Sequence, residues 1–335
     1  MNKITFVLVI LTATLYHAGL LTAGDPIEPY LERGTSGSFR YAIYNNQWLL
    51  HGQQWFDEKH ITRVAITGVL PEAEGEIAIP SSINGHEVYG IDDNAFESCK
   101  GVTGIRIPKT VRFLRPGTLN VCDGLQHIAV AEDHPEFASV DGVMFDKQKT
   151  KLLAFGSGHS GEYVIPNHTT EIGPNAFAGC TQLTRVIVPE SVTDIGGRSG
   201  TVFEGCRSLE RINLPVAVTN IGQKSFQDCS SLKEIVIPPE ITTIPFGLFW
   251  KCSRLKRVVL PDGIASIGNY AFADCAQLTL DRFPKSLTTV GAYAFKDCKA
   301  LRPLTVPQSV TSIGRSAFRG SPVKIGNQLE TRGGN

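Results

Sequence analysis

The sequence predicts a β-rich solenoid, in which short parallel strands stack coil upon coil. A repeat is the first sign: five phenylalanines, Phe226, Phe249, Phe272, Phe295 and Phe318, follow one another at intervals of 23 residues. A fixed period between about 20 and 50 residues is typical of solenoids. The composition is the second sign, because 33 Gly and 19 Pro alongside 42% hydrophobic residues fit short strands joined by many turns. We therefore expect one elongated core instead of the two compact domains that 335 residues would otherwise suggest.

Residues 1–23 have the features of a secretory signal peptide. Lys3 supplies a positive charge, the run Ile4–Tyr16 is apolar, and small residues follow it. We place the cleavage after Ala23, with Ala18 as the alternative site. The apolar run is shorter than the span of about 20 residues that a membrane helix needs, although an uncleaved anchor remains the alternative. We expect a secreted or cell-surface chain, outside the cytoplasm and without membrane insertion after cleavage.

The rest of the chain divides into four parts. Residues 24–38 are rich in Gly, Ser and Pro and are interpreted as a linker. Residues 39–90 contain short strand-like runs and are predicted to form an N-terminal β cap, since a solenoid needs an atypical end unit over its core. The regular repeats occupy residues 91–320, and residues 321–335 form a polar C-terminal tail.

The repeat unit reads L-x-x-V-x-I-P-x-S-V-T-x-I-G-x-x-A-F-x-x-C. The alternating L-x-x-V-x-I predicts a half-buried strand, which Pro ends because it has no N–H for a ladder. S-V-T-x-I predicts a second short strand, and Gly permits the turn after it. A-F-x-x-C is expected to form one helical or 3-10 turn with Phe and Cys pointing inward. Stacked together, these units predict a right-handed, leucine-rich-repeat-like solenoid.

Two places depart from the regular period. Between Leu119 and Phe177 the spacing is longer than two periods, and V-M-F and K-L-L-A-F there flank a polar turn. We interpret this stretch, about residues 131–166, as an inserted β-hairpin unit. Asp281 falls in the inward Val position of its repeat. A lone buried carboxylate is costly, so we expect a strand slip or bulge that turns Asp281 outward.

All eight cysteines occupy the same position of the repeat. Four disulfides would be the usual interpretation of eight cysteines in a secreted chain. However, side chains that point the same way from parallel coils have unsuitable Cβ directions for bridging. We therefore predict a buried column of free thiols. Its members are Cys99, Cys122, Cys180, Cys206, Cys229, Cys252, Cys275 and Cys298.

These units resemble a known family. The pattern C-x-x-L-x-x-V-x-I-P-x-S-V-T-x-I-G-x-x-A-F is similar to the BspA-type leucine-rich repeats of bacterial surface proteins, over about residues 40–320. S-V-D-G-V-M-F-D-K-Q-K-T-K-L-L, beginning at Ser139, is similar to an inserted unit of that family. The resemblance implies adhesion and protein binding at cell surfaces, with matrix proteins and other cells as partners. The chain lacks an evident surface anchor of the kind found in larger members.

The sequence gives little support for catalysis or for a cofactor. Its formal net charge is zero, which provides no general attraction for nucleic acid. Gly156-Ser-Gly-His-Ser-Gly161 satisfies G-x-G-x-x-G but precedes a strand-like run instead of a helix, so we expect a flexible turn. The histidines have no metal-ligand spacing. We predict no catalytic, metal-binding or cofactor-binding residues.

The outward positions of the first strand are the main binding candidates. Arg185, Arg211, Glu234 and Arg257 share one column, and Arg282 belongs to the next column outward. In a parallel ladder these side chains would form a mildly basic, partly apolar face, and solenoids bind partners on such extended faces. An ordinary solvated strand face is the alternative interpretation.

A second candidate is a row of aromatic residues. Tyr270 and Tyr293 occupy one position of successive coils, and Phe246 and Trp250 lie one coil earlier. Exposed aromatic side chains anchor many interfaces, but stacking between coils would explain them equally well.

We conclude from the sequence that this is a secreted or cell-surface repeat protein that binds extracellular proteins or glycans without catalysis. One alternative is a structural component that self-assembles or coaggregates, with weak self-association. The second alternative is an enzyme with a site in the cap or the hairpin insertion.

Overall fold

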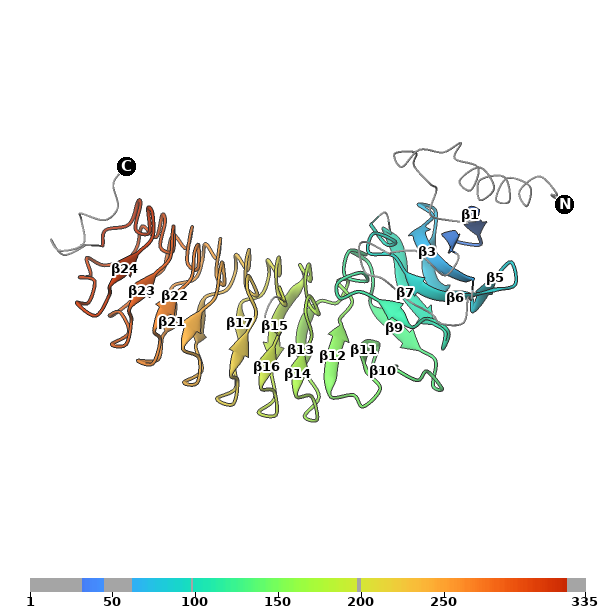
Figure 1. The fold of residues 1–335 in the computed structure, drawn as a ribbon, viewed down its shortest axis with the longest axis horizontal. Coiled ribbons are helices and arrows are strands. Elements are labelled where there is room, and N and C mark those ends of the chain that lie inside the picture. Colours follow the sequence, from blue (N-terminus) through green and yellow to red (C-terminus); the bar gives the residue numbers. More distant parts are fainter. Residues whose placement is uncertain (1–31, 45–61, 98, 198–199, 324–335) are drawn as a thin grey trace, which may run out of the picture.

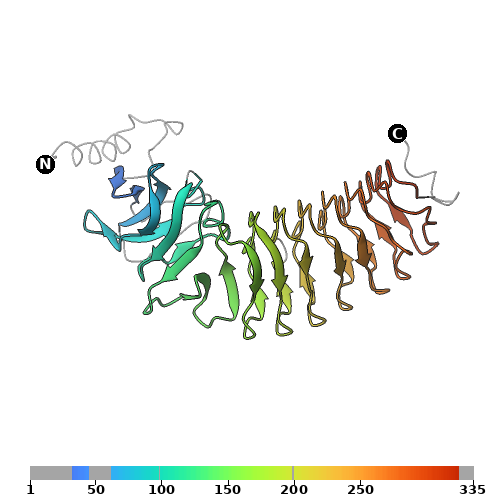
Figure 2. The same ribbon diagram turned by 180° about the vertical axis from the view of Figure 1, so that it is seen from behind.

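The computed structural model describes residues 32–44, 62–97, 99–197 and 200–323. Within these ranges the chain forms a curved row of stacked coils that leads from an N-terminal sheet to the last coil near residue 320 (Figures 1 and 2). The predicted signal peptide lies outside the described residues. Among the residues that are described, no helix is long and apolar enough to cross a membrane.

The N-terminal sheet begins earlier than expected. β1 (Glu32–Ser36) pairs antiparallel with β2 (Phe39–Tyr44), which pairs antiparallel with β3 (Arg63–Val69). β1 lies in the segment that we interpreted as a linker, so the linker prediction is wrong for residues 32–38. The Tyr41 hydroxyl donates to Glu32 Oε1 at 2.6 Å, and this contact helps to fix β1 against its neighbour.

Parallel stacking also starts inside the predicted cap. β6 (His86–Ile91) pairs parallel with β3 and with β8 (Phe113–Leu114), and antiparallel with β5 (Ser82–Ile83). β4 (Glu74–Ala78) pairs parallel with β7 (Gly101–Ile107), which pairs parallel with β9 (His127–Val130). The cap and the first coils therefore share continuous ladders, and the cap is not a separate β unit.

The hairpin insertion is present as predicted. β10 (Phe137–Val140) pairs antiparallel with β11 (Val143–Asp146), and β11 pairs antiparallel with β12 (Lys151–Ala154). β12 then pairs parallel with β14 (Glu171–Ile172), which returns the chain to regular coils.

The regular coils from β13 to β22 contribute two short parallel strands each, as the repeat predicts, whereas the last two coils contribute only the second strand. The first strands are β13 (Gly161–Val164), β15 (Leu183–Ile187), β17 (Arg211–Ile212), β19 (Glu234–Val236) and β21 (Arg257–Val259). The second strands are β14, β16 (Asp194–Ile195), β18 (Asn220–Ile221), β20 (Thr243–Ile244), β22 (Ser266–Ile267), β23 (Thr289–Val290) and β24 (Ser312–Ile313). Neighbouring coils align these strands in one register, for example Thr243 with Ser266.

The A-F-x-x-C segment is not helical, which corrects our expectation of a helical or 3-10 turn. Lys224 and Asp228 adopt left-handed φ values of 55° and 58° on either side of Phe226. A helix needs consecutive right-handed residues, so these two positions divide the segment into separate turns. The N–H groups of Lys224 and Phe226 donate instead to Phe246 and Leu248 of the next coil, at 2.9 and 3.0 Å. This turn ladder recurs along the regular coils and joins them to one another.

The core is a stack of phenylalanine rings, which we call the Phe column. Its members are Phe177, Phe203, Phe226, Phe249, Phe272, Phe295 and Phe318, with successive ring centroids 5.0–5.6 Å apart. All eight cysteines are buried, as predicted, and no disulfide joins them in the described residues. Ser321 occupies the cysteine position of the last coil, where its Oγ donates to Phe295 O at 2.5 Å and accepts from Cys298 N. The coil pattern thus continues into the segment that we assigned to the polar tail.

The strand slip expected at Asp281 is also present. Thr279, one residue earlier than the repeat would place it, bridges to Arg257. Leu280 is consequently buried, and the Asp281 side chain is exposed.

Candidate binding surface

The structure brings the predicted outward column together on one face. Arg185 lies opposite Arg211 in the β15–β17 ladder, and Glu234 lies opposite Arg257 in the β19–β21 ladder. Arg185 forms an ion pair with Glu162 at 3.0 Å. In the described part of the chain, no ion pair involves Arg211 or Arg257. Two guanidinium groups are therefore available to a partner on this face.

The column beside these charges contains three exposed valines. Val164, Val236 and Val259 are 55%, 60% and 38% exposed, and Val236 lies opposite Val259 in the ladder. Their strand neighbours, including Ile235 and Val258, point inward and are buried. Because the core does not use the outward valines, they provide apolar area to solvent. We call the valines together with Arg185, Arg211, Glu234 and Arg257 the strand face.

The strand face is hollowed where its ladder is interrupted. Depressions of about 200 and 260 Å³ share Ile212, Asn213 and Glu234 in their linings. The break lies between β17 and β19, whereas the Asn213 side chain contacts the coil on the other side of β17, where it accepts from Val188 N at 3.0 Å and donates to Val188 O at 2.7 Å. A side-chain amide thus replaces backbone pairing at Val188. The sequence did not indicate this hollow.

Arg282 does not extend the strand face as expected. The one-residue slip places Asp281, not Arg282, beyond Val259, and the Arg282 guanidinium pairs with Asp262. The side-chain hydrogen bond from Arg282 lowers the pKa of Asp262 below its usual range. Arg282 therefore serves a contact between coils.

The four aromatic candidates lie together in the turns that follow the second strands β20, β22 and β23, which we call the turn side of the coils. Tyr270 stacks on Tyr293 with ring centroids 4.9 Å apart and planes 19° from parallel, and it contacts Trp250 at 5.2 Å. Phe246 meets Tyr270 edge-on at 6.0 Å. Trp250 Nε1 donates to Asp274 at 3.1 Å. The Tyr270 ring contacts aromatic neighbours in the coils before and after it, so these contacts favour the structural interpretation.

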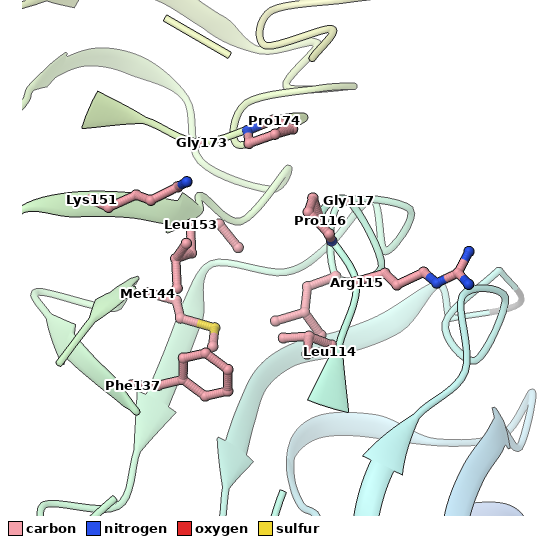
Figure 3. A pocket seen from close by; sticks show the side chains of 12 residues that line it. Leu114, Arg115, Pro116, Gly117, Phe137, Met144, Lys151, Leu153, Gly173 and Pro174 are labelled. Atoms are coloured by element: carbon pink, nitrogen blue, oxygen red, sulfur yellow. The ribbon is translucent and has the colours of Figure 1, made fainter. Parts of the chain in front are cut away.

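An apolar pocket of about 210 Å³ lies where the hairpin insertion interrupts the stack. Leu114 of β8 lies on one side of it, and Phe137 and Met144 of the hairpin lie on the other (Figure 3). Arg115 and Lys151 are at its margin, where they pair with Asp93 and Glu171. Its lining contains no carboxylate, histidine or cysteine, and Lys151, a residue type that can serve in acid–base chemistry, is paired with Glu171.

The remaining sequence candidates have structural roles. Gly156 and Gly158 are buried and lie against the backbone of residues 124–125, where a Cβ would collide with it. The G-x-G-x-x-G segment is thus a packed turn and not the flexible turn we expected. Among the described residues, no group of three or more potential metal ligands occurs.

Comparison with known proteins identifies the family. The BspA type leucine rich repeat pattern matches residues 76–151, 150–279 and 199–324 in six copies, and so covers most of the chain. The chain belongs to the BspA-type leucine-rich repeat family. The BspA-type repeats supply the stacked rings of the Phe column and the buried cysteine positions described above.

Solved structures of other repeat proteins are similar to this BspA-type chain. A leucine-rich repeat protein from Eubacterium ventriosum is 27% identical with a TM-score of 0.66, over 75% of this chain and 65% of that protein. The chain thus spans about two thirds of that relative's length. The pneumococcal vaccine antigen PcpA is 19% identical over 75% of this chain and 67% of its own, with a TM-score of 0.48. No curated protein sequence matches the chain.

Proposed function

We propose that this chain is a non-catalytic binding protein outside the cytoplasm, whose strand face contacts an extracellular protein. The observation that carries the proposal is the column with three exposed valines beside unpaired arginines. Val164, Val236 and Val259 add nothing to the core, and Arg211 and Arg257 have no ion-pair partner among the described residues. Apolar area surrounded by polar groups is the usual anatomy of a protein interface.

The chemistry of the face favours a protein partner over a glycan. Arginine is among the residues that contribute most to protein interfaces, and the buried centre of such an interface is apolar. Sugar recognition relies on exposed aromatic faces, whereas the Tyr270 ring contacts its aromatic neighbours instead. Parallel pairing sets the side chains of the strand face about 4.8 Å apart along the stack, which suits an extended partner surface.

Self-assembly and catalysis remain the competing functions. The exposed valines could also join two copies of the chain, which predicts a particle size that rises with concentration. Catalysis has weaker support, since the apolar pocket between Leu114 and Phe137 is lined by apolar side chains and by Arg115 and Lys151, which are both in ion pairs.

The test is a binding screen with variants of the strand face. The full chain, without its signal peptide, is applied to immobilised collagen, fibronectin and laminin and to a glycan array. The double variant Arg211→Glu/Arg257→Glu changes the face, and Val236→Asp changes one of its exposed valines. Arg315→Glu is the matched control, because Arg315 is exposed on the turn side. Light scattering of each variant measures self-association.

We expect an immobilised protein ligand to capture the chain. Its affinity should fall at least about tenfold in both face variants and stay unchanged in Arg315→Glu. Charge reversal at an interface typically costs more than about 1.4 kcal/mol, which is a factor of ten in affinity. Capture on the glycan array alone would replace the protein partner with a sugar. Equal binding of a ligand by all variants would overturn the proposal. It would also be overturned if no ligand were captured and the face variants instead lost a concentration-dependent oligomer that the unchanged chain forms.

A further inference from the structure

The buried cysteines follow one rule in most of the coils. Each thiol donates to the carbonyl oxygen of the phenylalanine one coil earlier. The distances are 3.0–3.1 Å for Cys206, Cys229, Cys252, Cys275 and Cys298, and 3.8 Å for Cys180. This hydrogen bond directs the sulfur towards a backbone oxygen and satisfies the thiol within the core.

Cys99 and Cys122 break this rule. The Cys122 thiol points to Cys99 Sγ at 2.6 Å, and its nearest carbonyl partner, Val102 O, is 3.6 Å away. This sulfur–sulfur separation is well inside ordinary van der Waals contact. Both side chains are buried, at 3% and 0% exposure, in the first two coils of the repeat. They come from successive coils in register, so the backbone brings the two sulfur atoms together.

The first two coils also lack a link that later coils have. In the regular coils the turn ladder joins neighbours, as in the bond from Phe226 N to Leu248 O at 3.0 Å. The equivalent donors in the first coil are Asn94 and Phe96, and in the described residues neither donates to the turn at 115–119 of the second coil. The thiol pair lies at the side of the coil where this backbone link is missing.

We propose that Cys99 and Cys122 are an oxidisable pair that closes to a disulfide between the first two coils when the chain folds in an oxidising compartment. The other six cysteines stay reduced, because their sulfur atoms point to carbonyl oxygens. This inference rests on the extracytoplasmic location in the proposed function but is independent of the strand face. The pair is reduced in this structure, as are the other cysteines.

The oxidation balances by thiol–disulfide exchange with an external disulfide, such as glutathione disulfide or a dithiol–disulfide oxidoreductase. The thiolate of Cys99 attacks one sulfur of that disulfide, which releases the first thiol and leaves a mixed disulfide. Cys122 loses its proton and attacks Cys99 Sγ, which releases the second thiol. Two protein thiols and one external disulfide thus become one protein disulfide and two external thiols.

Electrostatics assigns the roles in this exchange. The hydrogen bond from Cys122 lowers the pKa of Cys99 and raises the pKa of Cys122. Cys99 is therefore the thiol that ionises first and attacks the external disulfide. Because it is only 3% exposed, the exchange takes place while the first coils assemble or open locally.

The test counts and maps thiols in the full chain. Reduced protein is refolded with glutathione disulfide, quenched in acid, denatured and alkylated with N-ethylmaleimide. Peptide mapping by mass spectrometry before and after reduction then locates any bridge. Cys99→Ser is compared with Cys229→Ser, a control in which a regular coil loses its thiol.

We expect two of the eight thiols to become unreactive, and a reducible link between the peptides that contain Cys99 and Cys122. Cys229→Ser should form the same link, and Cys99→Ser should form none. Eight reactive thiols after oxidation of the wild type, or a bridge between any other pair, would overturn the proposal. Since mapping of the wild type is decisive by itself, misfolding of a variant does not affect the outcome. The thiol count does not depend on any ligand, so it can fail while the strand face still binds.

Discussion

Replacing Phe249 by alanine tests the Phe column, on which the whole stack depends. Phe249 is fully buried between Phe226 and Phe272, with ring centroids 5.6 and 5.4 Å away. Truncating a buried Phe to Ala costs about 3–5 kcal/mol of unfolding free energy. The neighbouring coils cannot collapse into the cavity, because the turn ladder fixes their spacing through bonds such as Phe249 N to Ala271 O at 2.8 Å. We therefore expect a loss in the upper part of this range, about 4–5 kcal/mol.

The assay is equilibrium unfolding in urea followed by circular dichroism, with native-state hydrogen exchange to locate the loss. Val236→Ala is the matched control, since its side chain is 60% exposed and its removal should change stability by no more than about 0.5 kcal/mol. Solenoid coils contact mainly their neighbours, so amide protection should fall most in the coils on either side of Phe249. A loss below about 1 kcal/mol, similar to that of the control, would refute the account of the core.

Three further predictions concern the stability of the chain: its pH dependence, the role of the thiols, and the contact across the hairpin insertion. His134 Nδ1 accepts from Glu136 N and Phe137 N, and desolvation lowers the pKa of His134 in the folded chain from 6.5. Between the folded pKa of His134 and 6.5, the unfolded state therefore binds more protons than the folded state. The stability that neutral His134 contributes should be full above about pH 6.5 and fall as the pH drops towards the folded pKa. Urea unfolding should show a weaker pH dependence of stability in His134→Asn. Cys252→Ser should cost about 1 kcal/mol or less by urea unfolding, because Ser321 already fills this position in the last coil, whereas Cys252→Leu should overpack the core by about 1–3 kcal/mol. Asn120→Ala should cost about 1–3 kcal/mol in the same assay, since the amide of Asn120, in the coil before the insertion, donates to carbonyl oxygens of residues 175, 176 and 178 in the coil after it at 2.8–3.3 Å. A larger effect than in Gln223→Ala would support this role.

The buried half of the fold could be predicted from the sequence. The period that aligns Phe226 with Phe249 fixes which residues point inward, because stacking leaves no other way to bury them. The same register indicated that Asp281 had to turn outward, and the strand slip provides this. These predictions rest on the free energy of burying each side chain, which depends mainly on residue type and can therefore be judged from the sequence.

The turns and the outward side chains were harder to predict. Lys224 and Asp228 both adopt left-handed conformations. Aspartate does so more often than most residues, but lysine gives no such sign, and the segment between them was wrongly expected to be helical. The position of Arg282 was missed because a one-residue slip moves every later side chain of the strand. The bonds from the Asn213 side chain to the Val188 backbone have no sequence signal either, since any exposed position can hold an amide.

Arginine footprinting tests the central claim, that the strand face is the binding surface, most directly. The full chain is modified with a glyoxal reagent, free and bound to a captured protein ligand, and each arginine is quantified by mass spectrometry. We predict that Arg211 and Arg257 become protected in the complex while Arg315, on the turn side, reacts equally in both states. Protection of Arg315 with Arg211 and Arg257 unchanged would contradict the account.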